Sequence, residues 1–142
     1  MKLPSPSVVA LALALGLAIA PVARAQVPEI VLQEVNHLLR YIRDSGCDFK
    51  RNGSWKYDSK AAEAHVRGKY EFLVRMGRID TTKDFIDGAA TKSSLSGDPY
   101  EIRCGSNLPV VTSLWLNDEL ARYRASQQQI RSSGLEQAPI TR

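Results

Sequence analysis

The chain has 142 residues, of which 19 are Lys or Arg and 15 are Asp or Glu, and its formal net charge is +4. The basic excess lies at the two ends, because residues 26–120 hold 13 basic residues against 14 acidic ones. A nucleic-acid-binding face needs clustered Lys and Arg to replace phosphate counterions, so this balance argues against nucleic acid as a partner.

The first 25 residues have the pattern of a signal peptide. Its parts are a basic start, an apolar run ended by proline and a small-x-small cleavage site: Lys2, Val8 to Ala20 followed by Pro21, and Ala23-Arg24-Ala25. The apolar run covers 13 residues, whereas a membrane-spanning helix needs about 20, so a retained membrane anchor is the less favoured alternative. We predict cleavage before Gln26 and export, to the periplasm or as a secreted protein without a membrane span.

Apolar residues recur at helical spacing over residues 29–44, which predicts a first helix. Its buried stripe leaves Glu34, Arg40 and Arg43 outside. The stripe consists of Val31, Val35, Leu38, Leu39 and Ile42. After it, Asn52-Gly53 can form the tight turn of a short β-hairpin over residues 48–57, because both residue types tolerate positive φ angles.

Two further helices follow the hairpin. Asp58 can cap a helix that runs to about Met76, and Asp80 or Thr81 can cap a short third helix through about Thr91. Their predicted buried residues are Ala62, Val66, Leu73 and Met76 in the second helix, and Phe85, Ile86, Ala89 and Ala90 in the third.

The last third of the chain predicts one strand and one more helix. Residues 100–104 alternate enough for a strand, and Thr112 or Ser113 can cap a final helix with Leu116 and Leu120 on its buried face. From Ser126 onward the chain is rich in Gln, Ser and Arg and has little to bury. Residues 126–142 are therefore predicted to be a disordered tail.

Cys47 and Cys104 are the two cysteines of the chain. In an exported chain an even pair favours a disulfide, with two separate buried thiols as the alternative. Such a bridge would bring the strand over residues 100–104 beside the hairpin in a small antiparallel sheet. The predicted fold is α+β and mainly α, with about four helices, a short β-hairpin, one further strand and one disulfide. It would form a single globular domain over residues 26–125.

Several short blocks follow one another in a specific order between Phe49 and Ile102. They are Arg51-Asn52-Gly53, Ala64-His65-Val66 with Lys69, Arg78-Ile79-Asp80-Thr81 with Phe85-Ile86-Asp87, and Ala90 with Ser93-Ser94, Gly97 and Pro99-Tyr100. On these blocks the chain resembles the YfeK-like family of small exported bacterial proteins. The resemblance implies a periplasmic or secreted bacterial domain of unknown function, and it carries over no catalytic residue.

Polar residues from three predicted elements could form one ligand-binding cluster. His65 and Lys69 share a helix face because residues four apart are neighbours. If the serine-rich turn folds against that face, its hydroxyl and N–H groups together with Lys and Arg would suit a carboxylate or a phosphate. The candidate site residues are Arg51, Asn52, His65, Lys69, Ser93, Ser94, Ser96 and Tyr100. The structural alternative is that the serines bond their own turn, Asn52 forms its hairpin and His65 bonds a backbone carbonyl.

The sequence carries no recognisable catalytic, metal or cofactor signature. Ser94-Leu95-Ser96-Gly97 lacks the first glycine of Gly-x-Ser-x-Gly, His37 and His65 fall on different predicted helices, and phosphate-loop and dinucleotide glycine patterns are missing. We therefore favour a non-enzymatic periplasmic or secreted binding domain that contacts an envelope protein or an anionic small ligand. A Ser/His hydrolase that uses His65 with a turn serine and a purely structural envelope accessory protein are the two alternatives.

Overall fold

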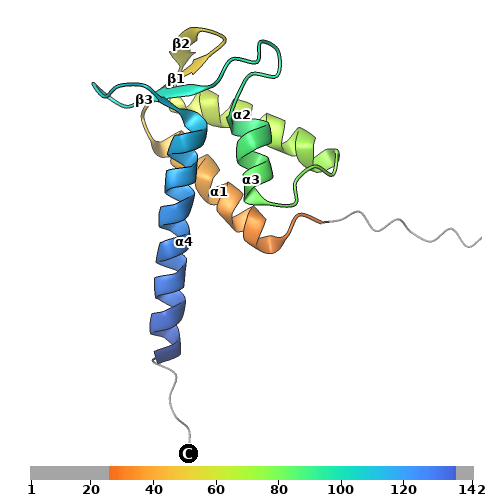
Figure 1. Cartoon of the computed structure of the whole chain (residues 1–142), viewed down its shortest axis with the longest axis vertical. Helices are drawn as coiled ribbons and strands as arrows, with labels where there is room; N and C mark the ends of the chain where they lie inside the picture. Colours follow the sequence, from red (N-terminus) through yellow and green to blue (C-terminus); the bar gives the residue numbers. More distant parts are fainter. Residues whose placement is uncertain (1–25, 137–142) are drawn as a thin grey trace, which may run out of the picture.

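The structure is a computed structural model that describes residues 26–136. The predicted signal peptide and its cleavage site, and residues 137–142, lie outside the described residues. Figure 1 shows a small sheet at one end of a helical body, with the last helix running down from that end. The elements in chain order are α1 (Glu29–Asp44), β1 (Asp48–Arg51), β2 (Ser54–Tyr57), α2 (Ser59–Arg75), α3 (Thr82–Phe85), the π-helical turn η1 (Ile86–Ala90), β3 (Glu101–Arg103), β4 (Val110–Val111) and α4 (Thr112–Glu136).

The predicted α+β, mainly α fold is confirmed. The four strands form one antiparallel sheet in the order β2-β1-β3-β4, which contains the predicted hairpin and the predicted later strand. Strand β4 was not predicted, because its two residues are too few to show an alternating pattern. Among the described residues, no helix has the length and apolar character needed to cross a bilayer.

The hairpin turn forms where the sequence predicted it. Asn52 and Gly53 have φ angles of 48° and 74°, the left-handed region that a two-residue hairpin turn requires at both positions. This turn places Arg51 at the end of β1, where its side chain packs over the ring of Tyr57 on β2 at 4.5 Å from the ring centre.

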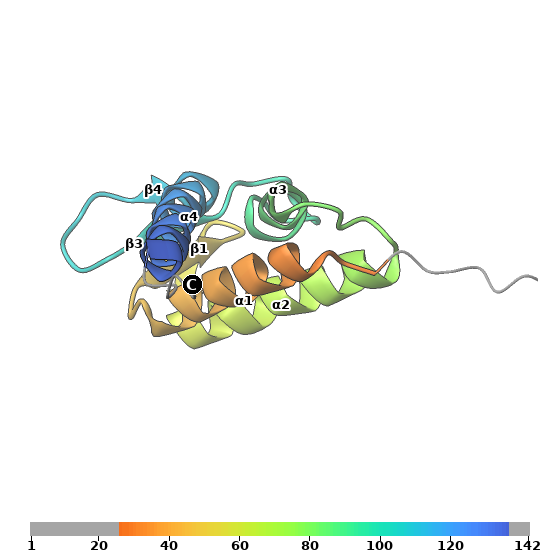
Figure 2. The ribbon, with the colours of Figure 1, turned by 90° about the horizontal axis from the view of Figure 1, so that it is seen from below.

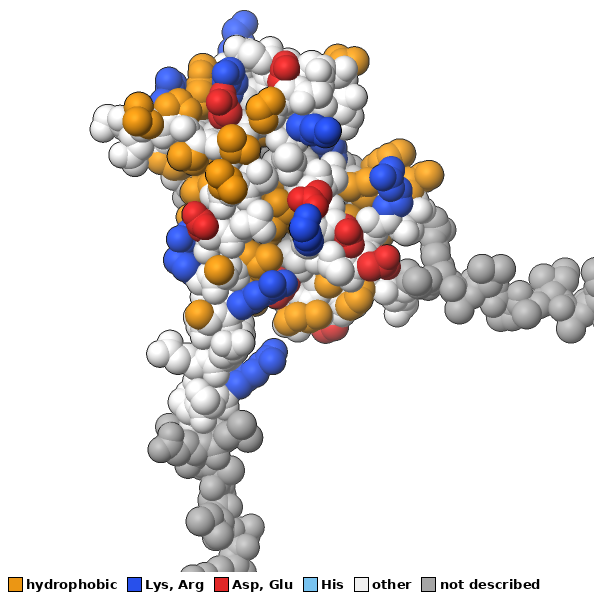
Figure 3. Space-filling view, in the orientation of Figure 1, with side chains coloured by type: hydrophobic (Ala, Val, Ile, Leu, Met, Phe, Trp, Pro, Cys, Tyr) orange, Lys and Arg blue, Asp and Glu red, His pale blue; other side chains and the backbone are white. Residues whose placement is uncertain are grey.

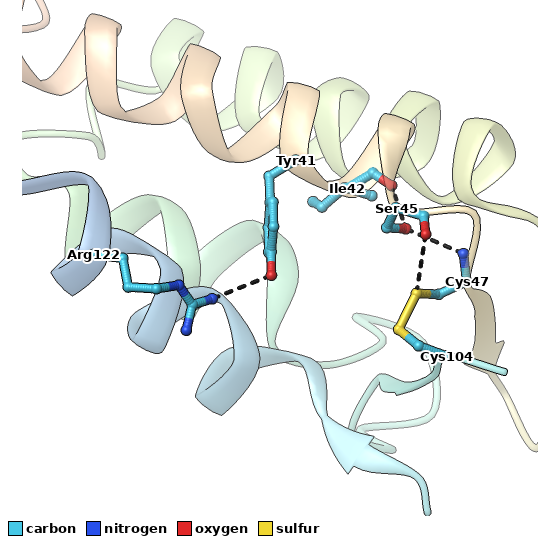
Figure 4. Close-up of a disulfide and its surroundings, with 6 residues drawn as sticks. All are labelled: Tyr41, Ile42, Ser45, Cys47, Cys104 and Arg122. Carbon is cyan, nitrogen blue, oxygen red and sulfur yellow. Dashed lines mark hydrogen bonds between the residues drawn. A yellow bond between two sulfur atoms is a disulfide. The ribbon is translucent and has the colours of Figure 1, made fainter. Parts of the chain in front are cut away.

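Cys47 and Cys104 form the predicted disulfide, which joins the start of β1 to the end of β3 (Figure 4). The two strands are paired beside it, with Phe49 opposite Ile102 in the sheet. Next to the bridge, Ser45 ends α1 by donating from its hydroxyl to the carbonyl of Ile42 at 2.8 Å. The disulfide therefore connects the end of the first helix to the later half of the sheet.

The hydrophobic core lies between the helices and one face of the sheet. All five predicted residues of α1 are buried, and α1 packs along α2 (Figure 2). Phe85 and Ile86 between α3 and η1, Ile102 on β3 and Leu116 on α4 close the core from the other side. The prediction for Met76 was wrong: its side chain is 59% exposed, because α2 ends at Arg75 and Met76 lies past the last turn that meets a neighbour.

The prediction that Glu34 lies outside the buried stripe was also wrong. Glu34 is 3% exposed and accepts two hydrogen bonds from the guanidinium of Arg124 on α4, at 2.7 and 2.8 Å. The hydroxyl of Thr82 donates to the same carboxylate. These hydrogen bonds, those from Arg124 above all, hold the pKa of Glu34 below its usual value against the opposing effect of burial.

The predicted disordered tail is wrong for residues 126–136, because α4 continues to Glu136. The last part of this helix extends beyond the body and its visible surface is mostly polar (Figure 3). Helix-forming Gln and Arg continue the helix, and the hydroxyls of Ser126, Ser132 and Ser133 bond carbonyls of the preceding turn at 2.7 to 2.9 Å. Residues 137–142 of the predicted tail lie outside the described residues.

Candidate functional site

A groove of about 520 Å³ runs between α2, η1 and the serine-rich turn. It is lined by Ala64, His65, Gly68, Lys69, Phe72, Leu73, Arg78, Gly88 and Ser94. Gly88 of η1 faces Leu73 of α2 in the lining of this groove. A Cβ at position 88 would come within 2.7 Å of Cδ1 of Leu73, so the glycine leaves room for the end of that side chain.

Helix α2 presents His65 and Lys69 to this groove. Asp58 starts the helix by accepting a hydrogen bond from the Ala61 amide at 2.8 Å, and Gly77 follows its last turn with a φ of 64°. His65 and Lys69 are four residues apart on this helix and so lie on one face. Both line the groove and both are half-buried.

Tyr100 connects these two side chains. Its hydroxyl lies 2.9 Å from Nε2 of His65 and 3.4 Å from Nζ of Lys69, and the ammonium of Lys69 stands 5.1 Å from the centre of the Tyr100 ring. Lys69 also donates to the carbonyl oxygen of Lys92 at 2.7 Å. Two backbone hydrogen bonds of 2.9 Å hold Tyr100 in place. Its amide donates to the carbonyl of Thr91, and its carbonyl accepts from the amide of Thr112.

Positive charge is in excess around this trio. Within residues 26–136, no carboxylate forms an ion pair with Arg51, Lys69 or Arg78. Burial, and then the charges of Arg51 and Lys69, lower the pKa of His65. Burial and the charge of Arg51 likewise lower the pKa of Lys69. Burial raises the pKa of Tyr100, against the opposing effect of Arg51.

Arg51 lies close to the groove but does not line it. Its side chain packs against Tyr57 and lines a separate small cavity that also has His65 and Tyr100 in its wall. Its Nε atom is buried and has no hydrogen-bond partner in the described structure. Arg51 therefore acts on the groove through its charge, as its effects on the pKa values of His65 and Lys69 show.

The serine-rich turn is held mainly by its own hydrogen bonds. The hydroxyl of Ser93 accepts from the amides of Leu95 and Ser96 at 3.2 and 3.3 Å, as in the structural alternative for this segment. The hydroxyl of Ser96 donates to Oδ1 of Asn52 at 3.0 Å, which ties the turn to the hairpin tip. Ser94 is exposed and lines the groove.

The eight predicted residues thus lie in one region but in three different roles. His65, Lys69 and Ser94 line the groove, Arg51 and Tyr100 stand behind it, and the remaining three fix the loops around it: Asn52, Ser93 and Ser96. No turn serine is hydrogen bonded to His65 in the described residues, so the alternative of a Ser/His hydrolase finds no serine–histidine pair in this arrangement.

Two residues that contribute to the groove, Arg78 and Phe72, were not among the predicted site residues. Arg78 adds a third basic side chain from the loop after α2, and exposed Phe72 adds an apolar surface. Arg78 appears in one of the blocks that resemble the YfeK-like family, but its distance along the chain from the other candidates concealed its place in the groove. No group of three or more His, Cys, Asp or Glu in residues 26–136 is arranged to hold a metal ion.

Comparison with known proteins places the chain in a family without assigning it an activity. Neither a search of curated proteins nor a search of solved structures found a match. The more specific resemblance to the YfeK-like family stays a prediction. The matched family is described as a family of unknown function, and its match runs from α1 to Arg124 in α4, across the disulfide and the groove. Over residues 30–124, this chain belongs to the family of unknown function DUF5329.

Proposed function

We propose that this protein is an exported binding domain whose groove receives an anionic oxygen group. That group would be the carboxylate or phosphate of a small ligand, or an acidic side chain of an envelope protein. The observation that carries the proposal is the state of Lys69: its half-buried ammonium is bonded to the neutral oxygens of Lys92 and Tyr100. A charge kept partly out of water without an opposite charge costs stability, and an anionic ligand would offset that cost.

The groove offers both parts of an amphipathic anion a matching surface. Lys69 and His65 at one end, with Arg78 further along, can donate hydrogen bonds to a carboxylate or phosphate. Phe72, which is 52% exposed, can cover a carbon portion of the ligand. The combination favours an organic anion or an acidic segment of a protein over a bare inorganic ion.

Export is supported by two observations of different kinds. The disulfide between Cys47 and Cys104 is typical of oxidising compartments outside the cytosol. The first 25 residues have the sequence pattern of a cleaved signal peptide. Together with the resemblance to the YfeK-like family, they support a periplasmic or secreted bacterial protein.

The test is a titration of the purified, oxidised protein with inorganic phosphate, acetate and a short Glu-rich peptide, followed by amide chemical shifts. We expect shifts to concentrate at His65, Lys69 and Ser94, and Lys69→Ala to weaken binding by about tenfold, the effect of one lost charge-assisted hydrogen bond.

The matched control is Lys60→Ala, which removes an exposed lysine from the same helix outside the groove. It should leave binding unchanged and so separate the groove from the general charge of α2. If all three probes bind equally to wild type and Lys69→Ala, the groove is not an anion site. The purely structural alternative would then be favoured.

A further inference from the structure

Beside the last turn of α2, the groove continues into a second, smaller hollow of about 280 Å³. The two hollows share three lining residues, Leu73, Arg78 and Gly88, so they form one path along the surface. Asp84 on α3 and Asp87 on η1 are three residues apart, and both line the smaller hollow. This hollow is therefore an acidic extension of the groove.

The charge of the lining side chains changes sign along this path. Among residues 26–136, no carboxylate lines the groove itself, whose basic side chains are those of Lys69 and Arg78. The acidic extension is lined by Asp84 and Asp87 and by one basic residue, Arg78. Arg78 forms no ion pair with either aspartate in the described part of the chain. A ligand that lies along both parts would therefore meet positive charge at one end and negative charge at the other.

Both aspartates can accept a further cationic partner. Asp84 accepts three hydrogen bonds, from the hydroxyl and amide of Thr81 and from the amide of Asp80, and all three go to Oδ2. These bonds lower the pKa of Asp84 and keep it ionised, and they leave Oδ1 for a ligand. Asp87 is paired with Lys83, but both side chains are more than half exposed. Such a pair contributes little, so a cationic group of a ligand can replace Lys83.

The part of the path between Lys69 and the aspartates has an apolar wall. Phe72 and Met76 are exposed, and they follow Lys69 at spacings of three and four residues, which keep them on its side of α2. The helix rises about 12 Å from His65 to Leu73, which about four residues of extended chain would cover. A small anion bound at Lys69 would leave this wall and the aspartates in water. The length and the two charges together favour a peptide.

We propose that the groove and its acidic extension bind a peptide segment of a partner protein, in which an acidic and a basic side chain flank an apolar one. The acidic side chain would bond Lys69, and the apolar one would cover Phe72. The basic side chain would pair with Asp84 and Asp87. This inference rests on the proposed function, from which it takes the anion-binding end. It adds the class of partner and the two carboxylates that select it.

The experiment compares labelled peptides by fluorescence anisotropy on the purified, oxidised protein at low salt. In the first peptide, Glu and Lys are separated by three residues with leucine in the centre, and its match carries Gln in place of Lys. Each peptide is made in both chain directions. We expect the Lys peptide to bind about fivefold more tightly than its Gln match in one direction, the contribution of one ion pair open to solvent. Equal affinities in both directions would overturn the proposal.

A variant of the acidic extension locates the basic side chain of the peptide. Asp87→Asn should remove the advantage of the Lys peptide and leave the binding of the Gln peptide unchanged. Its matched control is Glu71→Gln, which removes an exposed carboxylate of α2 that lines neither hollow and should keep the advantage. An advantage that persists in Asp87→Asn would contradict the assigned site.

Two further measurements separate this inference from the proposed function. Lys69→Ala should weaken both peptides, and if it weakens neither, the anion site itself fails. If Lys69→Ala weakens both but Lys and Gln peptides bind wild type alike, only the present inference fails. The last probe is 6-aminohexanoate, a small dipolar ion. An affinity equal to that of the Lys peptide would assign the groove to a small ligand and contradict a peptide partner.

Discussion

Two clusters of buried charge in this domain differ in how their charges are balanced. Where α1 meets α4, the carboxylate of Glu34 is bonded by Arg124 and Thr82, so one negative charge meets one positive charge. Beside α2, Arg51 and Lys69 bring two positive charges close to His65, and no carboxylate in the described part of the chain forms an ion pair with either.

The difference distinguishes a cluster that connects two helices from a cluster that we propose binds a ligand. The ion pair of Glu34 and Arg124 has its opposite charges in contact, so it needs no ligand, and it connects α1 to α4. An unbalanced cluster is a departure from what stability alone would select, and such departures are expected at functional sites. The unbalanced charge, more than the identity of any one residue, supports the groove as the candidate site.

The largest effect on stability should come from removing the disulfide, which is connected to both clusters only through the chain. The disulfide closes a stretch of chain with a sequence separation of 57 residues, and its loss should lower the free energy of unfolding by about 4 kcal/mol, mainly because the unfolded chain gains freedom. Urea unfolding of the Cys47→Ala/Cys104→Ala variant, beside oxidised wild type, measures this. Equal unfolding midpoints would show that the bridge adds nothing.

Disrupting the balanced cluster of Glu34, Arg124 and Thr82 should cause the second-largest loss of stability. Arg124→Ala leaves the buried Glu34 carboxylate with Thr82 alone and should lower the free energy of unfolding by about 2 kcal/mol, the usual contribution of a hydrogen bond to a charged group.

The matched control is Arg122→Ala, which removes an exposed guanidinium that bonds Glu119 and Tyr41. It should cost less, because Glu119 keeps its bond to Nε2 of His37 at 2.6 Å. If the two variants unfold alike, Glu34 does not depend on its partner.

The two clusters should also respond to acid in separate pH ranges. The pKa of His65 is lowered in the folded protein from its ordinary value of 6.5. The unfolded chain therefore binds the proton first, and stability should begin to fall as the pH drops below about 6.5. His65→Gln should remove this first decline in a series of thermal unfolding curves from pH 7.5 to 5.

The second decline in stability, at lower pH, includes the protonation of Glu34. Its folded pKa is lowered from an ordinary value of 4.5, so the stability that its ionised form contributes should be lost as the pH falls from about 4.5 through the lower folded pKa. Glu34→Gln should make this step smaller, because Asp84 and Asp44 also have lowered pKa values, and it should leave the step at higher pH unchanged. A single decline that both variants alter equally would contradict two independent clusters.

The smallest change in stability is expected from neutralising the unbalanced cluster. Lys69→Met removes a half-buried charge that has no opposite charge beside it, so the free energy of unfolding should stay within about 0.5 kcal/mol of wild type or rise. Chemical unfolding measures this, with Arg124→Met as the matched neutralisation in the balanced cluster. A loss in Lys69→Met as large as that in Arg124→Met would mean that Lys69 is structural.

The local elements of this protein could be predicted from the sequence because their causes lie within a few residues of each other. The apolar spacing over residues 29–44 places five side chains on one face of α1, Asn52-Gly53 accepts the φ angles of its turn, and Asp58 reaches the amide of Ala61. The disulfide was predictable for a different reason, since a chain predicted to be exported, with two cysteines, allows one pairing.

Which charged groups have a partner of opposite charge depends on the tertiary structure. Glu34 and Arg124 are 90 residues apart, and no periodicity relates them. Arg51, Tyr100 and Thr112 come from β1, from the residue before β3 and from the start of α4, so only the folded sheet brings them to one cavity. Helical and strand patterns report on neighbours along the chain, whereas electrostatic balance depends on neighbours in space. The sequence therefore predicted most of the helices, the hairpin and the bridge, whereas strand β4, the length of α4 and the placement of the charges depend on how those elements pack.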